Sequence, residues 1–127
     1  MRKKSKLKDR YLVKAKTNNG QWVAGLLTVM RGQLYVIDAD DENTAYLINK
    51  DTICQCTSLE DKYGNLIWEN DIIRGRYHTY KVIWDNEEGA WMAGTIELDH
   101  VPLYGLGGTN SKEYEVTGNI FDNPKLL

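Results

Sequence analysis

Residues 59–73 organise the chain, and they read Leu59-Glu60-Asp61-Lys62-Tyr63-Gly64-Asn65-Leu66-Ile67-Trp68-Glu69-Asn70-Asp71-Ile72-Ile73. Gly64 tolerates positive φ, and it lies between Asp61 and Asn65, whose side chains favour turns. The apolar residues 66–68 suit a half-buried strand. Residues 69–71 then form a second corner, at which Asp71 is expected to accept hydrogen bonds from backbone N–H groups before a strand begins at Ile72.

This stretch resembles the central signature of a known family. The matching pattern is Thr57-Ser58-Leu59-x-Asp61-x-x-Gly64-x-x-Ile67-Trp68-Glu69-Asn70-Asp71-Ile72-Ile73. A second match is the tail Glu115-Val116-Thr117-Gly118-Asn119-Ile120-Phe121-Asp122-Asn123-Pro124-Lys125-Leu126-Leu127, and residues 11–16 and 19–25 fit an opening hairpin. The family that these residues resemble is the YopX family of phage and prophage proteins.

The resemblance spans nearly the whole chain and implies a small β-rich protein that contains an SH3-like barrel. It implies no activity, because the family has no established biochemical function. One departure is Ser58, where many members have Gly, so the turn there is expected to be tighter or differently hydrogen-bonded. The residues assigned to the structural signature are Asp61, Gly64, Ile67, Trp68, Asn70, Asp71, Gly118, Asn119, Asn123 and Pro124.

Hydrophobic periodicity independently favours an all-β fold. Apolar and polar residues alternate in stretches such as 11–16 and 80–85, and about nine short strands recur at roughly ten-residue spacing. Asn19-Gly20 predicts a type I′ hairpin turn, and Gly25 predicts a bulge or bend in the returning strand. No window has the spacing of a long helix.

We expect three segments. Residues 1–9 form a basic flexible arm, residues 10–57 an N-terminal β-meander, and residues 58–127 the SH3-like barrel. The meander and the barrel are expected to share one core and act as one structural unit, because neither half alone is comfortably large.

Charge is distributed unevenly along the chain. The net charge is -2, yet residues 1–10 carry six basic residues and one acidic residue, so the remainder carries about −7. A basic arm can contact nucleic acid or an acidic partner, whereas its alternative role is that of a solvated terminus. The cations available for nucleic acid are Arg2, Lys3, Lys4, Lys6 and Lys8.

Other features bear on location. No apolar run is long enough to span a bilayer, and the basic start lacks the apolar region of a signal peptide. We therefore expect no membrane contact and a location in the cytoplasm of a bacterial host cell. Cys54 and Cys56 are expected to be free, partly buried thiols, because residues two apart on a strand rarely meet disulfide geometry.

Catalytic and metal-binding patterns are weak. The acidic loop 38–43 fails as a calcium loop, since Asn43 replaces the turn glycine and Asn49 replaces the bidentate Glu. Only His78 and His100 offer imidazole bases, and no Gly-x-Ser-x-Gly elbow or phosphate-binding glycine motif occurs. We therefore expect no enzyme activity, no metal and no cofactor.

Binding is the better-supported function class. The candidate binding residues are Trp68, Arg74, Arg76, Tyr77, His78, Tyr80 and Trp91. Residues 74–77 interleave cations with an aromatic side chain, a combination that contacts phosphates and stacks bases, but the acidic body opposes a polyanion. The sequence therefore predicts a non-enzymatic module for a phage or host protein, or for self-association through a strand edge. The alternative is an accessory protein that binds nucleic acid through the arm and Arg74/Arg76.

Overall fold

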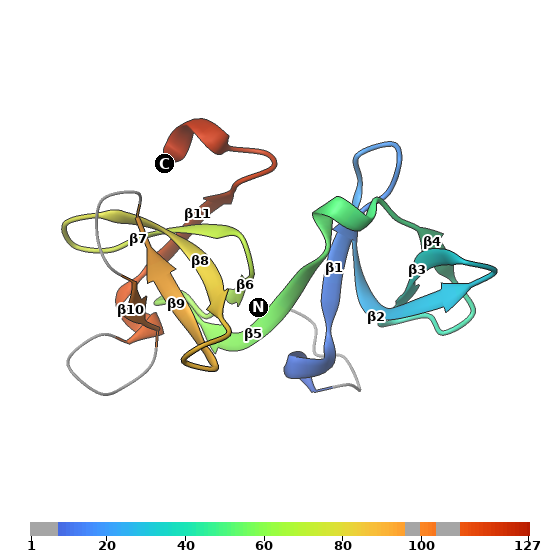
Figure 1. Ribbon diagram of the computed structural model, residues 1–127, viewed down its shortest axis with the longest axis horizontal. Coiled ribbons are helices and arrows are strands. Elements are labelled where there is room, and N and C mark those ends of the chain that lie inside the picture. The colour runs from blue at the N-terminus through green and yellow to red at the C-terminus, as the bar shows by residue number, and fades with distance from the viewer. Residues whose placement is uncertain (1–7, 96–99, 104–109) are drawn as a thin grey trace. The chain divides into compact units, whose positions relative to one another are not determined.

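The computed structural model describes residues 8–95, 100–103 and 110–127 (Figure 1). In these ranges the chain forms eleven strands and four single 3-10 turns, with no α-helix. All strand pairs of known register are antiparallel, and the strands belong to two sheets. The predicted all-β class is therefore confirmed. Of the basic arm, only residues 8 and 9 lie within the described ranges.

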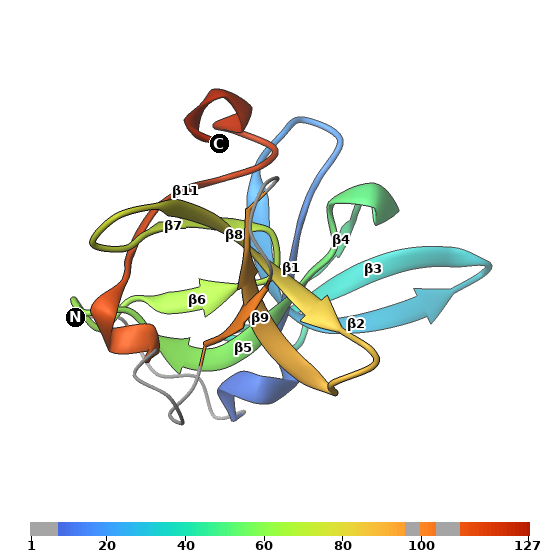
Figure 2. The same cartoon turned by 60° about the vertical axis from the view of Figure 1, so that its left-hand side comes forward.

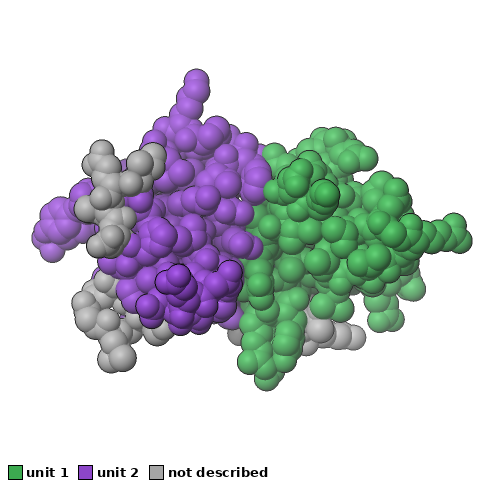
Figure 3. Space-filling view, viewed as in Figure 1, with its two compact units in different colours: residues 1–56 green, residues 57–127 purple. Residues whose placement is uncertain are grey.

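The chain divides into two compact units, residues 1–56 and residues 57–127 (Figure 3). The elements of the first unit are η1 (Asp9–Tyr11), β1 (Val13–Lys16), β2 (Trp22–Met30), β3 (Gln33–Asp38), β4 (Ala45–Leu47), η2 (Lys50–Thr52) and the start of β5 (Cys54–Glu60). Its strands follow the order β4-β3-β2-β1-β5. This is a meander with one added strand, because β5 returns to pair with β1.

The core of the first unit lies on one face of this sheet. Ala15, Val23, Val36 and Ile48 are buried together, and Val13, Leu34, Tyr46 and Ile53 pack around them. Alternate residues of a strand point to opposite faces, so the neighbours of these residues point away from this core. This second face of the sheet has Trp22 and Leu26 on β2 and Ile37 on β3.

Three glycine positions define the β1–β2–β3 meander. Residues 17–20 form the first turn, but only Gly20 has positive φ (84°), so the turn is not the predicted type I′. Arg31 (52°) and Gly32 (78°) both have positive φ, as a type I′ turn requires, between β2 and β3. At Gly25 the structure has no bulge: Gly25 pairs with Val13 and Asp38, and a Cβ atom there would overlap the Ile37 carbonyl oxygen.

Strand β5 bends where it enters the second unit. Ser58 has φ of 60°, a left-handed conformation that costs a non-glycine residue free energy. The Thr57 hydroxyl accepts from the Leu59 N–H at 3.0 Å and donates to the Ile67 carbonyl oxygen at 2.6 Å. The departure from glycine at Ser58 therefore falls at a position whose backbone conformation favours glycine.

The second unit contains the rest of β5 and six further strands. They are β6 (Leu66–Trp68), β7 (Asp71–Arg74), β8 (Thr79–Asp85), β9 (Ala90–Gly94), β10 (Val101–Pro102) and β11 (Glu115–Asn119), with η3 (Ser111–Glu113) and η4 (Pro124–Leu126). Strand β6 neighbours β5, and the other five form a sheet of order β10-β9-β8-β7-β11. Figure 2 shows β7, β8 and β9 as successive antiparallel strands.

The second unit has its own core. Ile67, Ile73, Val82, Ala93 and Leu103 are fully buried, and Tyr114 is 6% exposed beside them. Each unit therefore contains a buried apolar cluster of its own. The SH3-like barrel is not confirmed, because neither sheet closes into a barrel over the described residues.

The carboxylate of Asp61, which is 2% exposed, stabilises the signature turn at residues 61–65 by hydrogen bonds. Its Oδ1 accepts hydrogen bonds from the N–H groups of Tyr63 and Asn65, both at 2.9 Å. Its Oδ2 accepts from the Val116 N–H on β11 at 3.0 Å and from the Asn65 side-chain amide. Burial raises the pKa of Asp61, but these hydrogen bonds outweigh it and hold the pKa below its ordinary value.

The second corner ties β6, β7 and β8 together. Asp71 Oδ2 accepts from the Trp68 N–H at 2.8 Å, which is the backbone contact that the sequence predicts for Asp71. Asn70 has φ of 70°, and its N–H donates to the Val82 carbonyl oxygen at 2.9 Å. The Ile120 N–H donates to the Asn70 carbonyl oxygen at 3.1 Å, so the chain after β11 returns to this corner.

In the tail, the side chains of Asn119 and Asn123 accept hydrogen bonds from nearby backbone N–H groups. Asn119 Oδ1 accepts from the N–H groups of Phe121 and Asp122, at 3.0 and 2.9 Å. A Cβ atom at Gly118 would overlap the Asn123 side chain, whose Oδ1 accepts from the Asn119 N–H at 3.3 Å. Pro124 begins η4, where its missing N–H costs no hydrogen bond.

Two further features concern the chain as a whole. Cys54 and Cys56 are not joined in a disulfide, as expected, and they are more deeply buried than predicted, at 1% and 2% exposure. Within the described ranges, no helix has the length and apolar character needed to cross a membrane.

Candidate functional site

The β7–β8 hairpin presents most of the predicted binding residues. Its turn is closed by a hydrogen bond from the Gly75 N–H to the His78 carbonyl oxygen at 2.9 Å. Arg74, Arg76, Tyr77 and His78 are exposed, and the exposed fraction of Tyr77 is 78%. The Arg76 guanidinium lies over the Tyr77 ring, 5.5 Å from its centroid. The hairpin therefore exposes a tyrosine ring, two guanidinium groups and an imidazole.

Aromatic rings connect this hairpin to the core. Tyr80 on β8 contacts His78 edge to face at 6.0 Å between centroids, and it contacts Tyr114 in the same manner at 5.6 Å. Tyr114 follows η3 and packs against Gly75, where a Cβ atom would lie 2.8 Å from the ring. Edge-to-face pairs add to the free energy of burial. Glycine at position 75 therefore permits the hairpin and Tyr114 to approach closely.

These groups line a pocket of about 530 Å³. Its lining residues, which we name the aromatic groove, are Gly75, Arg76, Tyr77, Tyr80, Glu113 and Tyr114. Asn110 caps η3 by accepting from the Lys112 N–H at 2.9 Å, and the Tyr114 carbonyl oxygen accepts from the Lys62 N–H at 2.9 Å. Two short segments distant in sequence thus supply one pocket with three tyrosines, one cation and one anion.

The structure brings together some predicted binding residues and separates others. Arg76, Tyr77 and Tyr80 line the groove, and Arg74 and His78 lie on the same hairpin. Trp91 instead packs against the core of the second unit and contacts Trp84 on β8 at 5.1 Å. Trp68 lies at the signature corner, where its N–H donates to Asp71.

Sequence reasoning missed Glu113 and Tyr114. Their contribution depends on η3, which follows residues of high glycine content and which no periodic pattern marks. The alternation of Tyr114 and Val116 was the only available signal, because it predicts that both side chains point to one face. That signal does not reveal the hairpin on which Tyr114 packs.

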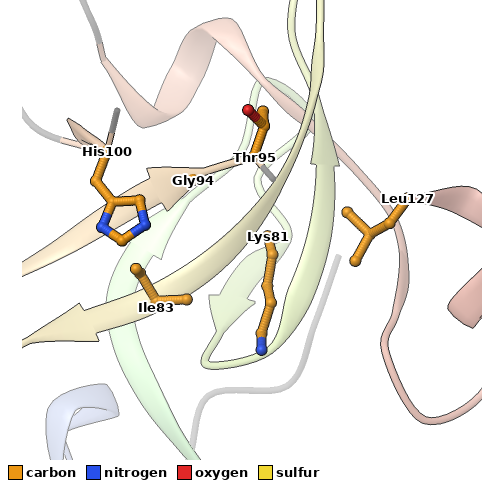
Figure 4. A pocket seen from close by; sticks show the side chains of 6 residues that line it. All are labelled: Lys81, Ile83, Gly94, Thr95, His100 and Leu127. Carbon is orange, nitrogen blue, oxygen red and sulfur yellow. The ribbon is translucent and has the colours of Figure 1, made fainter. Parts of the chain in front are cut away.

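A smaller pocket of about 230 Å³ lies elsewhere in the second unit (Figure 4). Lys81, Ile83, Gly94, Thr95, His100 and Leu127 line it. The His100 ring packs on Gly94, where a Cβ atom would overlap the imidazole. Figure 4 shows the ring directed toward Ile83, with Lys81 between Ile83 and Leu127. Its surface is mainly apolar, and no predicted binding residue lines it.

In the acidic loop, residues 38–43, the carboxylates of Asp38 and Asp41 accept hydrogen bonds from nearby groups of the same segment. Asp41 accepts from the Thr44 hydroxyl and from the Asn43 N–H, and these two hydrogen bonds lower the pKa of Asp41, in that order of importance. The Asp40 N–H donates to Asp38 Oδ1 at 2.8 Å. Within the described ranges, no group of three or more His, Cys, Asp or Glu residues is placed to hold a metal ion.

The fold and the groove define a small antiparallel β protein with an open pocket lined by tyrosines. No curated protein matches the chain. The model of the YopX protein family matches residues 2–127. The chain therefore belongs to the YopX family, as its signature and tail predict.

Proposed function

We propose that this YopX-family chain is a non-enzymatic protein-interaction module whose aromatic groove binds an extended segment of a protein partner. We further propose that it is encoded by a phage or prophage and acts in the cytoplasm of the bacterial host, which rests on the family resemblance. The observation that supports a binding role is the convergence of Arg76, Tyr77 and Tyr80 with Glu113 and Tyr114 around one pocket.

The chemistry of the groove favours a protein ligand. Tyr and Arg are enriched at protein interfaces and dominate their binding energy, because each offers a large contact area with a polar end. Tyr77 is 78% exposed, so a partner would bury most of that ring. Glu113 and Arg76 add one charge of each sign, which suits a peptide of mixed charge.

Photo-crosslinking in the cells that make the protein tests this proposal. A photoreactive phenylalanine analogue replaces Tyr77 in one variant and Tyr63 in the control. Tyr63 is a matched control because it is 67% exposed and has Lys62 over its ring at 5.3 Å, yet it does not line the groove. We expect one defined protein adduct from position 77 and none of that mass from position 63. Identical adducts at both positions, or none at either, would contradict the proposal.

Nucleic acid is the second candidate ligand, favoured by one observation. Arg74 and Arg76 are exposed beside Tyr77, and Arg76 lies over its ring, an arrangement that can contact phosphates and stack a base. Lys8 is exposed as well, whereas Arg2, Lys3, Lys4 and Lys6 lie outside the described residues. Glu113 in the groove opposes this role, since a carboxylate repels phosphate.

Fluorescence anisotropy separates the two candidates. Labelled single- and double-stranded DNA and RNA are titrated with the full chain and with a chain that lacks residues 2–8, at low and moderate salt. Binding that weakens steeply with salt and needs the arm supports the nucleic-acid role. A flat titration at low salt removes it and leaves the protein-binding role.

A further inference from the structure

A large apolar surface lies on the first unit and shares no residue with the aromatic groove. It is the sheet face opposite the first core, and we name it the apolar face; its residues are Trp22, Leu26, Met30, Tyr35, Ile37 and Leu47. Leu26, Met30 and Leu47 are 39%, 42% and 38% exposed, and the other three are half-buried. Single exposed apolar residues are ordinary, but a contiguous set of this kind marks an interaction surface.

The strand register shows that the set is contiguous. Leu26 is directly opposite Ile37, which is directly opposite Ala45 on β4. The next row along the strands pairs Thr28 with Tyr35 and Tyr35 with Leu47. Directly opposite side chains on one face of a sheet lie close enough to touch. Both rows consist of uncharged residues, so the centre of the face carries no charge.

Opposite charges flank this uncharged centre. On β1, the ammonium groups of Lys14 and Lys16 lie 4.7 and 5.4 Å from the centroid of the Trp22 ring. Beyond β3, the loop 39–44 exposes Asp40, Asp41 and Glu42. Strand β2 separates the two groups, since the sheet order is β4-β3-β2-β1.

The two charged groups lie at the same end of the sheet. Lys14 pairs with Ala24, and the Ala39 N–H donates to the Ala24 carbonyl oxygen at 3.1 Å from the other side. When two copies stack face to face about a twofold axis parallel to β2, the lysines of one copy therefore meet the acidic loop of the other. A surface that is complementary to itself in this manner is what a symmetric dimer needs.

We propose that a second copy of this chain covers the apolar face in a twofold-symmetric dimer, with Lys14 and Lys16 of each copy facing Asp40, Asp41 and Glu42 of the other. Packing of the uncharged rows supplies affinity, because apolar burial is the main favourable contribution to association. The charged flanks set the orientation, because the twofold arrangement opposes unlike charges on both sides of β2. This contact is independent of the aromatic groove, so either proposal can fail without the other.

Sedimentation velocity of the full chain, from low micromolar to several hundred micromolar, tests the dimer. We expect a reversible monomer–dimer equilibrium. Leu26→Lys and, separately, Met30→Lys should each weaken dimerisation at least about tenfold, because each places a charge in the uncharged centre. Both residues are exposed, so circular dichroism should show folded variants; if one fails to fold, the other retains the test.

Charge reversal tests the orientation. Lys14→Glu with Lys16→Glu should weaken the dimer, as should Asp40→Lys with Glu42→Lys, and the four changes together should restore most of the affinity. Asp41 is left unchanged because it caps its own loop. Lys112→Glu with Glu88→Lys, two exposed positions on the second unit, is the matched control and should have no effect. A monomer at every concentration would overturn the proposal, and so would a dimer that tolerates Leu26→Lys or a reversal that the combined variant does not rescue.

Discussion

Asp61 is the residue on which the signature turn and the end of the second unit both depend. Its two oxygens accept from the N–H groups of Tyr63, Asn65 and Val116, the last of which is 55 positions later in the chain. A buried N–H group without an acceptor costs about 1–3 kcal/mol. The carboxylate therefore stabilises a turn and a distant strand together.

Asp61→Asn should lower the free energy of unfolding at neutral pH by about 2–3 kcal/mol, because an amide offers only one acceptor oxygen. The folded pKa of Asp61 lies below its unfolded value, so this stabilisation is present above about pH 4 and is lost as pH falls through the folded pKa. The difference between wild type and variant should thus shrink in acid. Urea unfolding at several pH values measures it, with Glu88→Gln as an exposed control.

Ser58 gives a second prediction at the scale of one residue. Its φ of 60° suits glycine, and a β-branched side chain fits there poorly. Ser58→Gly should leave stability unchanged or raise it by up to about 1 kcal/mol, since relief of the backbone strain is partly offset by the entropy of unfolded glycine. Ser58→Val should lower stability by about 1–2 kcal/mol. Equal midpoints of thermal unfolding for the two variants would contradict the backbone explanation.

Strand β2 shows what a single glycine does for a whole element. It is the central strand of the meander, paired with β1 on one side and β3 on the other, and Gly25 takes part in both pairings. The obstacle to a side chain there is the Ile37 carbonyl group, which is part of the backbone. At Gly118 the obstacle is the Asn123 side chain, which can rotate away.

Gly25→Ala should therefore destabilise the protein much more than Gly118→Ala. We expect a loss of at least about 3 kcal/mol at Gly25, with broad changes in the amide spectrum of the first unit, since strands must separate to admit a methyl group. Gly118→Ala should cost about 1 kcal/mol, the lost hydrogen bond to Asn123 Oδ1. An equal loss of unfolding free energy in the two variants would contradict this explanation, since it requires the backbone carbonyl near Gly25 to move less easily than the Asn123 side chain near Gly118.

Elements were easier to predict than their connections. Alternation and turn residues predicted most strands, because a half-buried strand leaves a period of two in the sequence. The type I′ turn predicted at Asn19-Gly20 and the bulge predicted at Gly25 are both absent from the structure. Turn type and close backbone approach depend on the partner strand, which the local sequence does not specify. Three residues that line the groove, Arg76, Tyr77 and Tyr80, are among the binding residues that the sequence predicts, because they are close together in the sequence. Tyr114 escaped prediction because tertiary packing alone brings it to Gly75.

At the scale of the whole molecule, the central fact is that the described buried residues form two cores. Each unit buries its own set of residues: Val36 and its neighbours in the first unit, and Ile73 and its neighbours in the second. The expectation that the two halves share one core, which rests on the shortness of each half, stays a prediction.

Core substitutions should accordingly have local effects. Val36→Ala should cost about 2 kcal/mol and Ile73→Ala about 2–5 kcal/mol, because both side chains are fully buried. Hydrogen exchange should accelerate mainly in residues 13–53 for the first variant and mainly in residues 59–116 for the second. Uniform acceleration across the chain in both variants would indicate that the two cores unfold as one.

The aromatic groove is the feature from which a function for the whole molecule is inferred. The most direct test is the affinity of the chain for a peptide selected against it from a library of random peptides, compared among wild type, Tyr77→Ala and Tyr63→Ala. Both tyrosines are exposed, so neither variant should unfold. We predict that Tyr77→Ala weakens binding at least about tenfold and that Tyr63→Ala leaves it unchanged. A library that yields no binder, or a selected peptide bound equally well by Tyr77→Ala, would contradict the assignment of the groove as the binding site.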